Sequence, residues 1–178
     1  MEPSDETLAR AASAGDGAAF AALLARHYDR LFALAFRLTG ARAEAEDLTQ
    51  DICAALPAKL ARFRGEARVS TWLYRVAVNA AHDRRRRQAT RVKAAEGWGD
   101  WEVSRQAAME EDALRGDWLT HAMRRLPDDL RDTLALVLDE ATHAEAAEVL
   151  GVSEGTISWR VSEAKKRLRA MRKEEEDA

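Results

Sequence analysis

The chain has 178 residues, 47% of them hydrophobic and 33% charged, and its 28 Lys and Arg against 31 Asp and Glu give a net charge of −3. This composition argues against a disordered chain, and no run of about 18 apolar residues is present to cross a bilayer. The single cysteine, Cys53, rules out an internal disulfide, and the N-terminus lacks the apolar block of a secretory signal, so we expect a cytoplasmic protein without membrane insertion. The four histidines lie far apart, without the spacing of zinc ligands, so we expect neither a metal nor a cofactor.

Helix-forming residues dominate the chain, which has three prolines and nine glycines and lacks alternating β-branched runs. We therefore predict an all-α fold. The first predicted helix begins after Asp16, a residue that can cap it, and ends at Gly40. The second spans about 43–62, with Pro57 expected to kink or interrupt it one turn earlier. Its outer face carries polar and acidic side chains: Asp47, Gln50 and Asp51.

A charged loop around Gly65 precedes a third helix, which Ser70 can cap and which runs from Thr71 to about residue 90. One face of this helix is apolar and would complete a small bundle with the first two helices. The other face carries an aromatic, an amide and arginines: Trp72, Arg75, Asn79 and Arg86. Such a face suits single-stranded nucleic acid, because rings stack on unpaired bases and arginines follow the backbone. Trp72 and Phe63 fit a core position equally well, and both interpretations stay open.

Residues 90–110 mix glycine, acids and two tryptophans, Trp98 and Trp101, without periodicity, and we interpret them as a linker. The tryptophans fit docking on a partner and packing against the chain's own domains equally well. A second bundle follows, with a helix over about 111–125, another that Pro127 starts, and two more. In the helix after Pro127 the residues expected to point inward are Leu130, Leu134, Val137 and Leu138.

The last two helices form a helix-turn-helix pattern, THAEAAEVLGVSEGTISWRVSEAKKRL, which begins at Thr142. Thr142 and Glu145 have the spacing of a capping box, Gly151 permits a tight turn, and Ser153 caps the last helix. One face of that helix then points outward, where a recognition helix meets the major groove. The side chains expected on this face include Glu154, Thr156, Ser158, Arg160 and Lys165. Residues near the helix start suit base edges, and the lysines suit phosphates.

Positive charge is concentrated in two segments of this acidic chain. Residues 62–93 contain ten basic and two acidic side chains, a net charge of +8, and residues 155–173 contain seven and one, a net charge of +6. Between them, residues 94–118 carry −5. The run from Arg84 to Arg87 points in all directions around a helix, so we expect it to grip phosphates without reading sequence. The two segments predict two surfaces that face nucleic acid.

Three motifs resemble the extracytoplasmic-function (ECF) group of sigma-70 family RNA polymerase sigma factors: AEDLTQDI, FRGEARVSTWLYRVAVNAAHDRRRR, and LPDDLRDTLALVL followed by the helix-turn-helix. Together they cover most of residues 15–172. The resemblance implies a sigma-2-like bundle over 1–89, a linker over 90–110 and a sigma-4-like bundle over 111–178. It also implies an alternative sigma factor that binds core RNA polymerase, recognises the minus-ten and minus-thirty-five promoter elements, starts transcription of a specific gene set and is controlled by an anti-sigma factor.

The same resemblance implies roles for individual residues. Contact with the coiled coil of the polymerase beta-prime subunit falls to Asp47, Gln50 and Asp51. Binding of single-stranded minus-ten DNA falls to Phe63, Arg64, Arg68, Trp72, Arg75, Asn79, Arg84 and Arg86. Binding of the minus-thirty-five duplex falls to Ser153, Glu154, Thr156, Ser158, Arg160, Lys165 and Lys166.

The sequence departs from the pattern of the family at four positions. Cys53 and Pro57 stand where many members have bulky aromatics, in the second predicted helix. In the recognition helix Trp159 replaces a usual small residue, and Glu163 a usual basic one. We expect Glu163 to point outward and pair with one of two arginines, Arg160 or Arg167.

Other functional classes fit less well. A response-regulator-type transcription factor would use the second bundle alone, and the nucleic-acid features of the first bundle would serve no purpose. A decoy that captures an anti-sigma factor without touching DNA would not need Arg75, Asn79 or the basic recognition helix. An enzyme is the least favoured class, because no nucleophile–base pair, phosphate loop or metal-ligand cluster is present.

Overall fold

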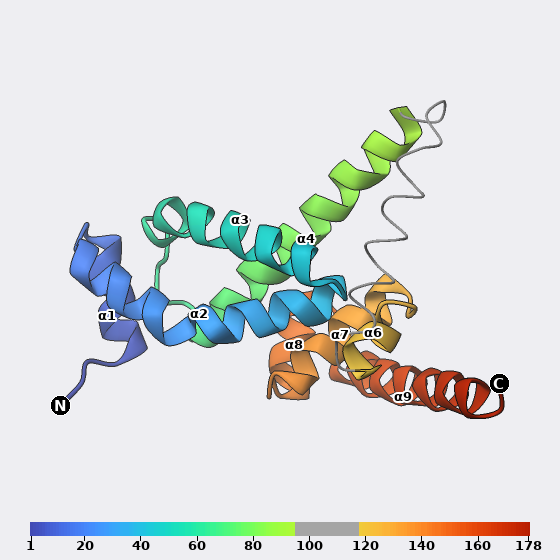
Figure 1. Cartoon of the computed structure of the whole chain (residues 1–178). Helices are drawn as coiled ribbons and strands as arrows, with labels where there is room; N and C mark the ends of the chain where they lie inside the picture. Colours follow the sequence, from blue (N-terminus) through green and yellow to red (C-terminus); the bar gives the residue numbers. More distant parts are fainter. Residues whose placement is uncertain (95–117) are drawn as a thin grey trace.

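The structure is a computed structural model that describes residues 1–94 and 118–178. All regular structure in these residues is helical, which confirms the all-α prediction. The first group comprises α1 (Asp5–Ser13), α2 (Gly17–Thr39), α3 (Arg42–Leu60) and α4 (Val69–Ala94). The second comprises α6 (Trp118–Met123), α7 (Asp128–Leu138), α8 (His143–Leu150) and α9 (Glu154–Glu176). Figure 1 shows the two groups packed together, with the C-terminal half of α4 projecting from the first.

Helix α2 begins and ends where the sequence predicts. The Asp16 carboxylate accepts from the backbone N–H groups of Ala18 and Ala19 at 3.0 and 3.1 Å, and Gly40 ends the helix at a φ of 73°. A Cβ at Gly40 would also lie 2.7 Å from the Cβ of Arg124, in the turn that follows α6. Two constraints therefore favour glycine at this position: the left-handed backbone conformation, and the close approach of Arg124, which leaves no space for a Cβ.

The structure differs from prediction at three helix boundaries. Helix α1 was not predicted, although Ser4 caps it by accepting from the N–H of Thr7 at 3.2 Å. Helix α3 continues through Pro57, because a proline in the last turn costs few hydrogen bonds, so the expected interruption is absent. Helix α4 begins at Val69, which is fully buried, and this places Ser70 inside the first turn. It continues to Ala94, beyond the predicted end near residue 90.

The helix-turn-helix predictions are confirmed. The Thr142 hydroxyl accepts from the N–H of Glu145 at 3.1 Å, and the Glu145 carboxylate accepts from the N–H of Thr142 at 2.9 Å. Gly151 adopts a φ of 67°, and the Ser153 hydroxyl accepts from the N–H of Thr156 at 3.1 Å. The prediction that Leu138 points inward is wrong, because this last residue of α7 is 37% exposed. The predictions on Trp98, Trp101 and the start of the helix expected over 111–125 fall outside the described residues.

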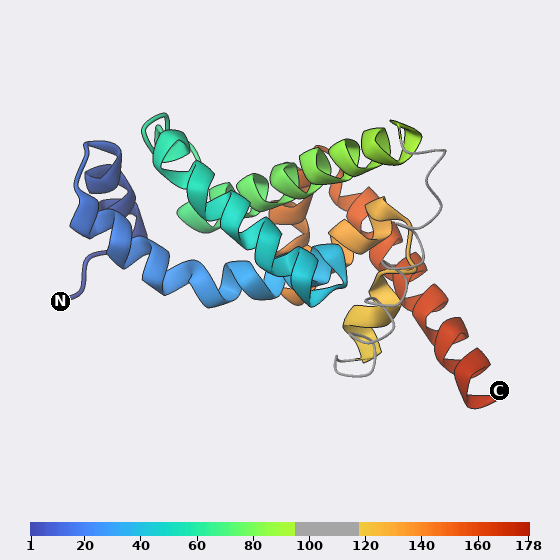
Figure 2. The same cartoon turned by 45° about the horizontal axis from the view of Figure 1, so that its top comes forward.

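The two groups share one continuous apolar core, in which α7 has the central place. Helix α7 packs against α2, α8 and α9, and α8 packs against α4; the adjacent positions of the two groups are visible in Figure 1 and Figure 2. Every residue of α7 from Leu130 to Leu136 is buried. A helix buried on all sides must bury its polar side chains as well, and each of these then needs a partner.

The partners of Asp132 come from α4. Its carboxylate, 3% exposed, accepts from both terminal nitrogens of Arg85 at 2.6 and 2.9 Å, and Nε2 of His82 lies 2.8 Å away. Burial alone would raise the pKa of Asp132, but the hydrogen bonds and positive charges of His82 and Arg85 outweigh it and lower the pKa of this carboxyl. Asp132 is therefore a buried anion that joins the two groups.

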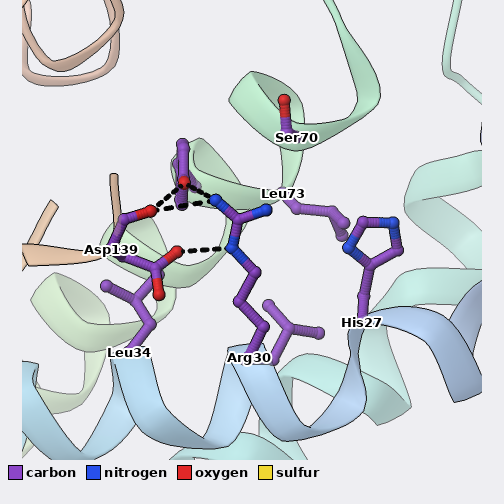
Figure 3. A pocket seen from close by; sticks show the side chains of 8 residues that line it. His27, Arg30, Leu34, Ser70, Leu73 and Asp139 are labelled. Atoms are coloured by element: carbon purple, nitrogen blue, oxygen red, sulfur yellow. Dashed lines mark hydrogen bonds and ion pairs between the residues drawn. The ribbon is translucent and has the colours of Figure 1, made fainter. Parts of the chain in front are cut away.

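Asp139, the residue after α7, makes the second polar connection. Its carboxylate accepts from Nε of Arg30 at 2.7 Å and from Arg37 at 3.2 Å. Its backbone carbonyl accepts from the Tyr74 hydroxyl at 2.8 Å and from Arg30 at 2.9 Å, and Figure 3 shows Arg30 directed at Asp139. We call Asp132, Asp139 and their partners the interdomain clasp; the full set is Arg30, Arg37, Tyr74, His82, Arg85, Asp132 and Asp139.

Replacing the buried acid of the clasp should destabilise the fold. We expect Asp132→Ala to lower the free energy of unfolding by about 1–3 kcal/mol, because Arg85 and His82 lose a charged partner but are open enough to water to be partly solvated. Urea unfolding followed by far-ultraviolet circular dichroism measures this change.

The matched control is Asp83→Ala, which removes an exposed carboxylate that pairs with Arg86 on the same helix. We expect that variant to change the free energy of unfolding by less than about 0.5 kcal/mol. Equal effects of the two substitutions would show that the clasp does not stabilise the chain.

Candidate nucleic-acid interface

One face of α4 carries half of the residues predicted for the first nucleic-acid surface. Trp72, Arg75, Asn79 and Arg86 are spaced at three, four and seven residues, which places them along one side of the helix. Asn79 and Arg86 are exposed, while Trp72 and Arg75 are half-buried. Arg64 and Arg68, both exposed, lie in the loop that leads into this helix. The loop and α4 thus form a continuous polar surface with several cations.

The aromatic residues of this surface contact each other. The rings of Phe63 and Trp72 lie 5.1 Å apart at an angle of 56°, and both pack against the apolar core of the first group. Each ring is half-buried and keeps part of its surface open. Because both residues are only partly buried, a core position and stacking on a base both stay open, and stacking stays a prediction.

Arg84 does not share the face of Trp72 and Asn79. Its guanidinium is turned toward α3, where it pairs with Asp47 at 3.1 Å and with Asp51 at 3.2 Å. Arg87 adds a second contact to Asp51 at 3.7 Å. The predicted polymerase-binding acids therefore meet the arginine run, although both carboxylates keep about half of their surface exposed. Gln50 is exposed on the same helix.

The arginine run diverges around its helix, as the sequence predicts. Arg84 points to α3 and Arg85 to the interdomain clasp, while Arg86 pairs with Asp83 one turn earlier. Arg75 reaches the second group and pairs with Glu148 of α8 at 3.3 Å. In this conformation most of the predicted DNA-facing arginines of α4 have acidic partners within the chain.

The second predicted surface lies on α9 and its N-cap. Glu154, Ser158, Lys165 and Lys166 are exposed and Thr156 is half-buried, while Ser153 caps the helix. The Ser158 hydroxyl lies 3.1 Å from Nδ1 of His143, at the start of α8. The prediction that Arg160 points outward is wrong, because its side chain is 18% exposed and folds back to Asp129 of α7 at 3.8 Å. Glu163 pairs with Arg167 at 3.0 Å, one of its two expected partners.

The sequence reasoning missed the residues that join the two groups. Asp132 and Asp139 are seven residues apart and lie opposite Leu130 and Leu134 on α7, so the pattern of one amphipathic helix places both in water. Their burial depends on the second apolar surface that the first group supplies. Tyr74, 4% exposed, was missed for the same reason. The sequence offers one signal of this contact: two acids seven residues apart, on the face of the helix opposite its apolar residues.

Other kinds of site find no support in the described ranges 1–94 and 118–178. No group of three or more His, Cys, Asp and Glu side chains there is arranged to hold a metal ion. None of the described helices combines the length and apolar character needed to cross a bilayer. Cys53 is a free, half-buried thiol, and burial raises its pKa, which lowers the fraction of reactive thiolate.

Two helical groups, each with a cationic face and the second built on a helix-turn-helix, define a two-domain transcription factor of the sigma-70 type. Residues 23–91 match the family described as Sigma-70 region 2, and residues 116–168 match Sigma-70, region 4. The division into two groups seen in the structure follows these two matches.

Within this class the chain belongs to the ECF RNA polymerase sigma factors. It is 37% identical over 169 residues to the ECF RNA polymerase sigma factor SigM of Mycobacterium tuberculosis strain H37Rv, a match that covers 94% of this chain and 84% of the relative. It is 29% identical over 167 residues to SigW of Bacillus subtilis, which covers 87% and 89% of the two chains.

Solved structures have the same fold. CnrH in complex with the cytosolic domain of CnrY matches with a TM-score of 0.67 and 26% identity, over 94% of this chain and 96% of that one. The sigma factor RpoE of Bartonella quintana, in complex with the anti-sigma factor NepR, matches with a TM-score of 0.69 and 24% identity over 86% and 96%. Both matches extend over the two helical groups together.

Proposed function

We propose that this chain is an alternative sigma factor that binds core RNA polymerase, recognises the minus-ten and minus-thirty-five promoter elements and starts transcription of a specific gene set. The observation that carries the proposal is the presence, in one ECF-family chain, of an Asn- and Arg-bearing face on α4 and a helix-turn-helix with an exposed basic helix. The first face suits unpaired bases and the second suits a duplex. A factor that holds a single strand at one promoter element and a duplex at the other needs both.

The proposal assigns each surface a partner. Residues 1–89 bind polymerase and the minus-ten element, residues 90–110 link the domains, and residues 111–178 bind the minus-thirty-five element. Asp47, Gln50 and Asp51 contact the polymerase in this proposal, and all three are exposed on α3. The loop and α4 residues from Phe63 to Arg86 serve the single strand, and the N-terminal half of α9 serves the duplex.

Arg84 and Arg160 take modified roles in this proposal. Arg84 lies between the α3 acids and the phosphates that it would contact, so it links the polymerase-facing and DNA-facing surfaces. Arg160, held by Asp129, supports the position of α9 against α7 and would reach DNA only after leaving that acid. The base-facing positions on α9 are therefore those that point directly away from its buried side.

Promoter binding by both domains requires the interdomain clasp to open. The two promoter elements lie about 25 base pairs apart, or about 85 Å along a duplex at about 3.4 Å per base pair. A compact chain of this length has a radius of gyration of only about 16 Å. Arg75 and Arg85, which pair with acids of α7 and α8, would be released in the same step. We infer that the described closed form is the one that precedes polymerase binding.

CnrH was solved in complex with the cytosolic domain of CnrY, and RpoE in complex with the anti-sigma factor NepR. We propose that an anti-sigma protein holds this chain as well. Because its polymerase and promoter partners are cytoplasmic, we place the chain in the cytoplasm. Sigma factors are transcription initiation factors, so we assign the chain no enzymatic activity of its own.

Transcription from a random promoter library tests the proposed function. Core polymerase mixed with the purified chain should produce run-off transcripts that share a two-part upstream consensus, while core polymerase alone should not. Sequencing the transcripts measures the consensus. Transcripts without a shared upstream sequence would overturn the proposal, and binding of the isolated chain to duplex without polymerase would favour a regulator.

Asp51→Arg tests the polymerase-binding surface. We expect loss of affinity for core polymerase, because the substitution reverses a charge on the exposed acidic side of α3 and also repels Arg84 and Arg87. Binding is measured by co-elution with core polymerase, and circular dichroism checks the fold. The control is Asp29→Arg, the same change at an exposed position of α2. Normal affinity in Asp51→Arg would remove α3 from the interface.

Lys165→Ala tests the phosphate contacts of α9. We expect polymerase assembled with this variant to bind all promoter duplexes more weakly, with the slope of log affinity against log salt reduced by about one. Lys59→Ala, at an exposed lysine of α3, should leave the slope unchanged. A changed consensus with an unchanged slope would mean that Lys165 reads bases.

A further inference from the structure

Trp159 is the most exposed aromatic side chain in the part of the chain that the structure describes. It is 61% exposed, on the second turn of α9, whereas Tyr28 on α2 is 45% exposed. A single exposed ring is common on protein surfaces, so exposure alone assigns no contact. What distinguishes Trp159 is its position on the recognition helix and the charge around it.

Trp159 lies at the centre of the outward face of α9. The inward face is formed by Ile157, Val161, Ala164 and Leu168, all buried. The opposite face, at spacings of four, three and four residues, carries Gly155, Trp159, Ser162 and Lys166, all exposed. This face points directly away from the support that α7 and α8 give to α9. In a docked recognition helix it is the face nearest the floor of the groove.

Gly155 leaves room for the indole. Gly155 lies one turn before Trp159 on the same face, and it has no side chain that could stand between the indole and a docked molecule. A Cβ at Gly155 would meet only the Ser153 hydroxyl, at 3.8 Å, so the surface there is open. The N-terminal end of α9, where a recognition helix contacts base edges, therefore presents an unobstructed aromatic ring.

The polar neighbours of Trp159 are engaged within the chain. The Ser158 hydroxyl contacts His143, Arg160 pairs with Asp129, and the Thr156 hydroxyl lies 2.9 Å from that of Ser153. A side chain that already has a partner must break that contact before it reads a base. Trp159 is 61% exposed, and its indole makes no hydrogen bond or ring contact with the described residues, so it has no such contact to break.

The charge around Trp159 favours DNA over a protein partner. Residues 155–173 carry a net charge of +6, and Lys165, Lys166 and Arg169 continue the exposed surface from Trp159 along the helix. Phosphates flank every base edge in a major groove, so this arrangement suits an aromatic contact between two phosphate-binding positions. A hydrophobic protein groove would not need these cations.

We propose that Trp159 is a specificity-determining residue that reads a thymine in the minus-thirty-five element. Thymine is the only base that presents a methyl group in the major groove, and its neighbouring O4 accepts hydrogen bonds. The indole offers an apolar edge for the methyl and Nε1–H for an acceptor. This inference rests on the proposed function, because it takes the duplex at α9 to be a promoter element.

Selection of duplexes by the polymerase complex tests the proposal. Core polymerase assembled with the wild-type chain, Trp159→Ala or Tyr28→Ala selects from a library randomised over the minus-thirty-five region. We expect Trp159→Ala to lose a preference for thymine of about fivefold to tenfold at one or two adjacent base pairs, and to keep the rest of the consensus. Tyr28→Ala removes an exposed aromatic from the first group and should select the wild-type consensus.

Methyl removal provides a second, independent test. At the base pair identified by selection, dT is replaced by deoxyuridine, which lacks only the C5 methyl. We expect about a fivefold loss of affinity with the wild-type chain and none with Trp159→Ala. Equal losses with both chains would overturn the proposal.

The remaining outcomes separate this inference from the proposed function. A wild-type consensus that Trp159→Ala retains would overturn the role of Trp159 alone. Loss of polymerase or anti-sigma affinity with that consensus unchanged would assign Trp159 to a protein contact and overturn it too. A uniform loss of affinity across all duplexes would mean that Trp159 supports α9 without reading a base, and would overturn its role in specificity. A wild-type chain without any promoter preference would overturn both the function and this inference.

Discussion

Two buried carboxylates, Asp132 on α7 and Asp139 directly after it, connect the two helical groups. Asp132 and Asp139 are taken out of water on the side of α7 that faces away from its own helix-turn-helix, and only Arg30, Arg85 and their neighbours in the first group reach them. A buried carboxylate without such partners would be strongly unfavourable, so the burial of these acids depends on the approach of the first group. The close passage of Arg124 over Gly40 becomes possible only in this arrangement. A connection made of ion pairs, in addition to apolar packing, can be replaced when other anions compete for the same cations.

On the proposed function, such competition accounts for the basic segment that lies on α4 of this acidic chain. The arginines of α4 that would meet phosphates lie against carboxylates of α3, α7 and α8, at Asp51, Asp132 and Glu148. If these arginines bind DNA as proposed, phosphates would replace the carboxylates, and the cations would keep a counter-charge throughout. On α9 the exposed lysines are already directed outward, so the second surface needs less rearrangement than the first. We infer that the order of events begins with polymerase and ends with promoter.

The helix caps and turns could be predicted from the sequence because each depends on residues within one turn of the chain. Side-chain orientations that depend on contacts between distant helices could not. Asp16, the pair Thr142–Glu145 and Gly151 act within one turn of the chain, and the structure confirms each of them. Leu138 and Arg160 were misplaced because their orientation depends on where α7 ends and on Asp129 across the bundle. The residues of the candidate nucleic-acid surfaces came from a resemblance to a family, and the structure regroups them. It separates Arg84 from the face of Asn79 and places Trp159, treated in the sequence only as a departure, at the centre of the outward face of α9.

The distance between the two groups tests most directly whether a closed chain opens to bind its promoter. Spin labels at exposed Ala54 of α3 and Ala170 of α9, in a chain with Cys53→Ser, report this distance by pulsed electron paramagnetic resonance. We expect one short distance in the free chain and a separation longer by several tens of ångströms with core polymerase and promoter, because the two elements lie about 85 Å apart. The same short distance in both states would contradict it.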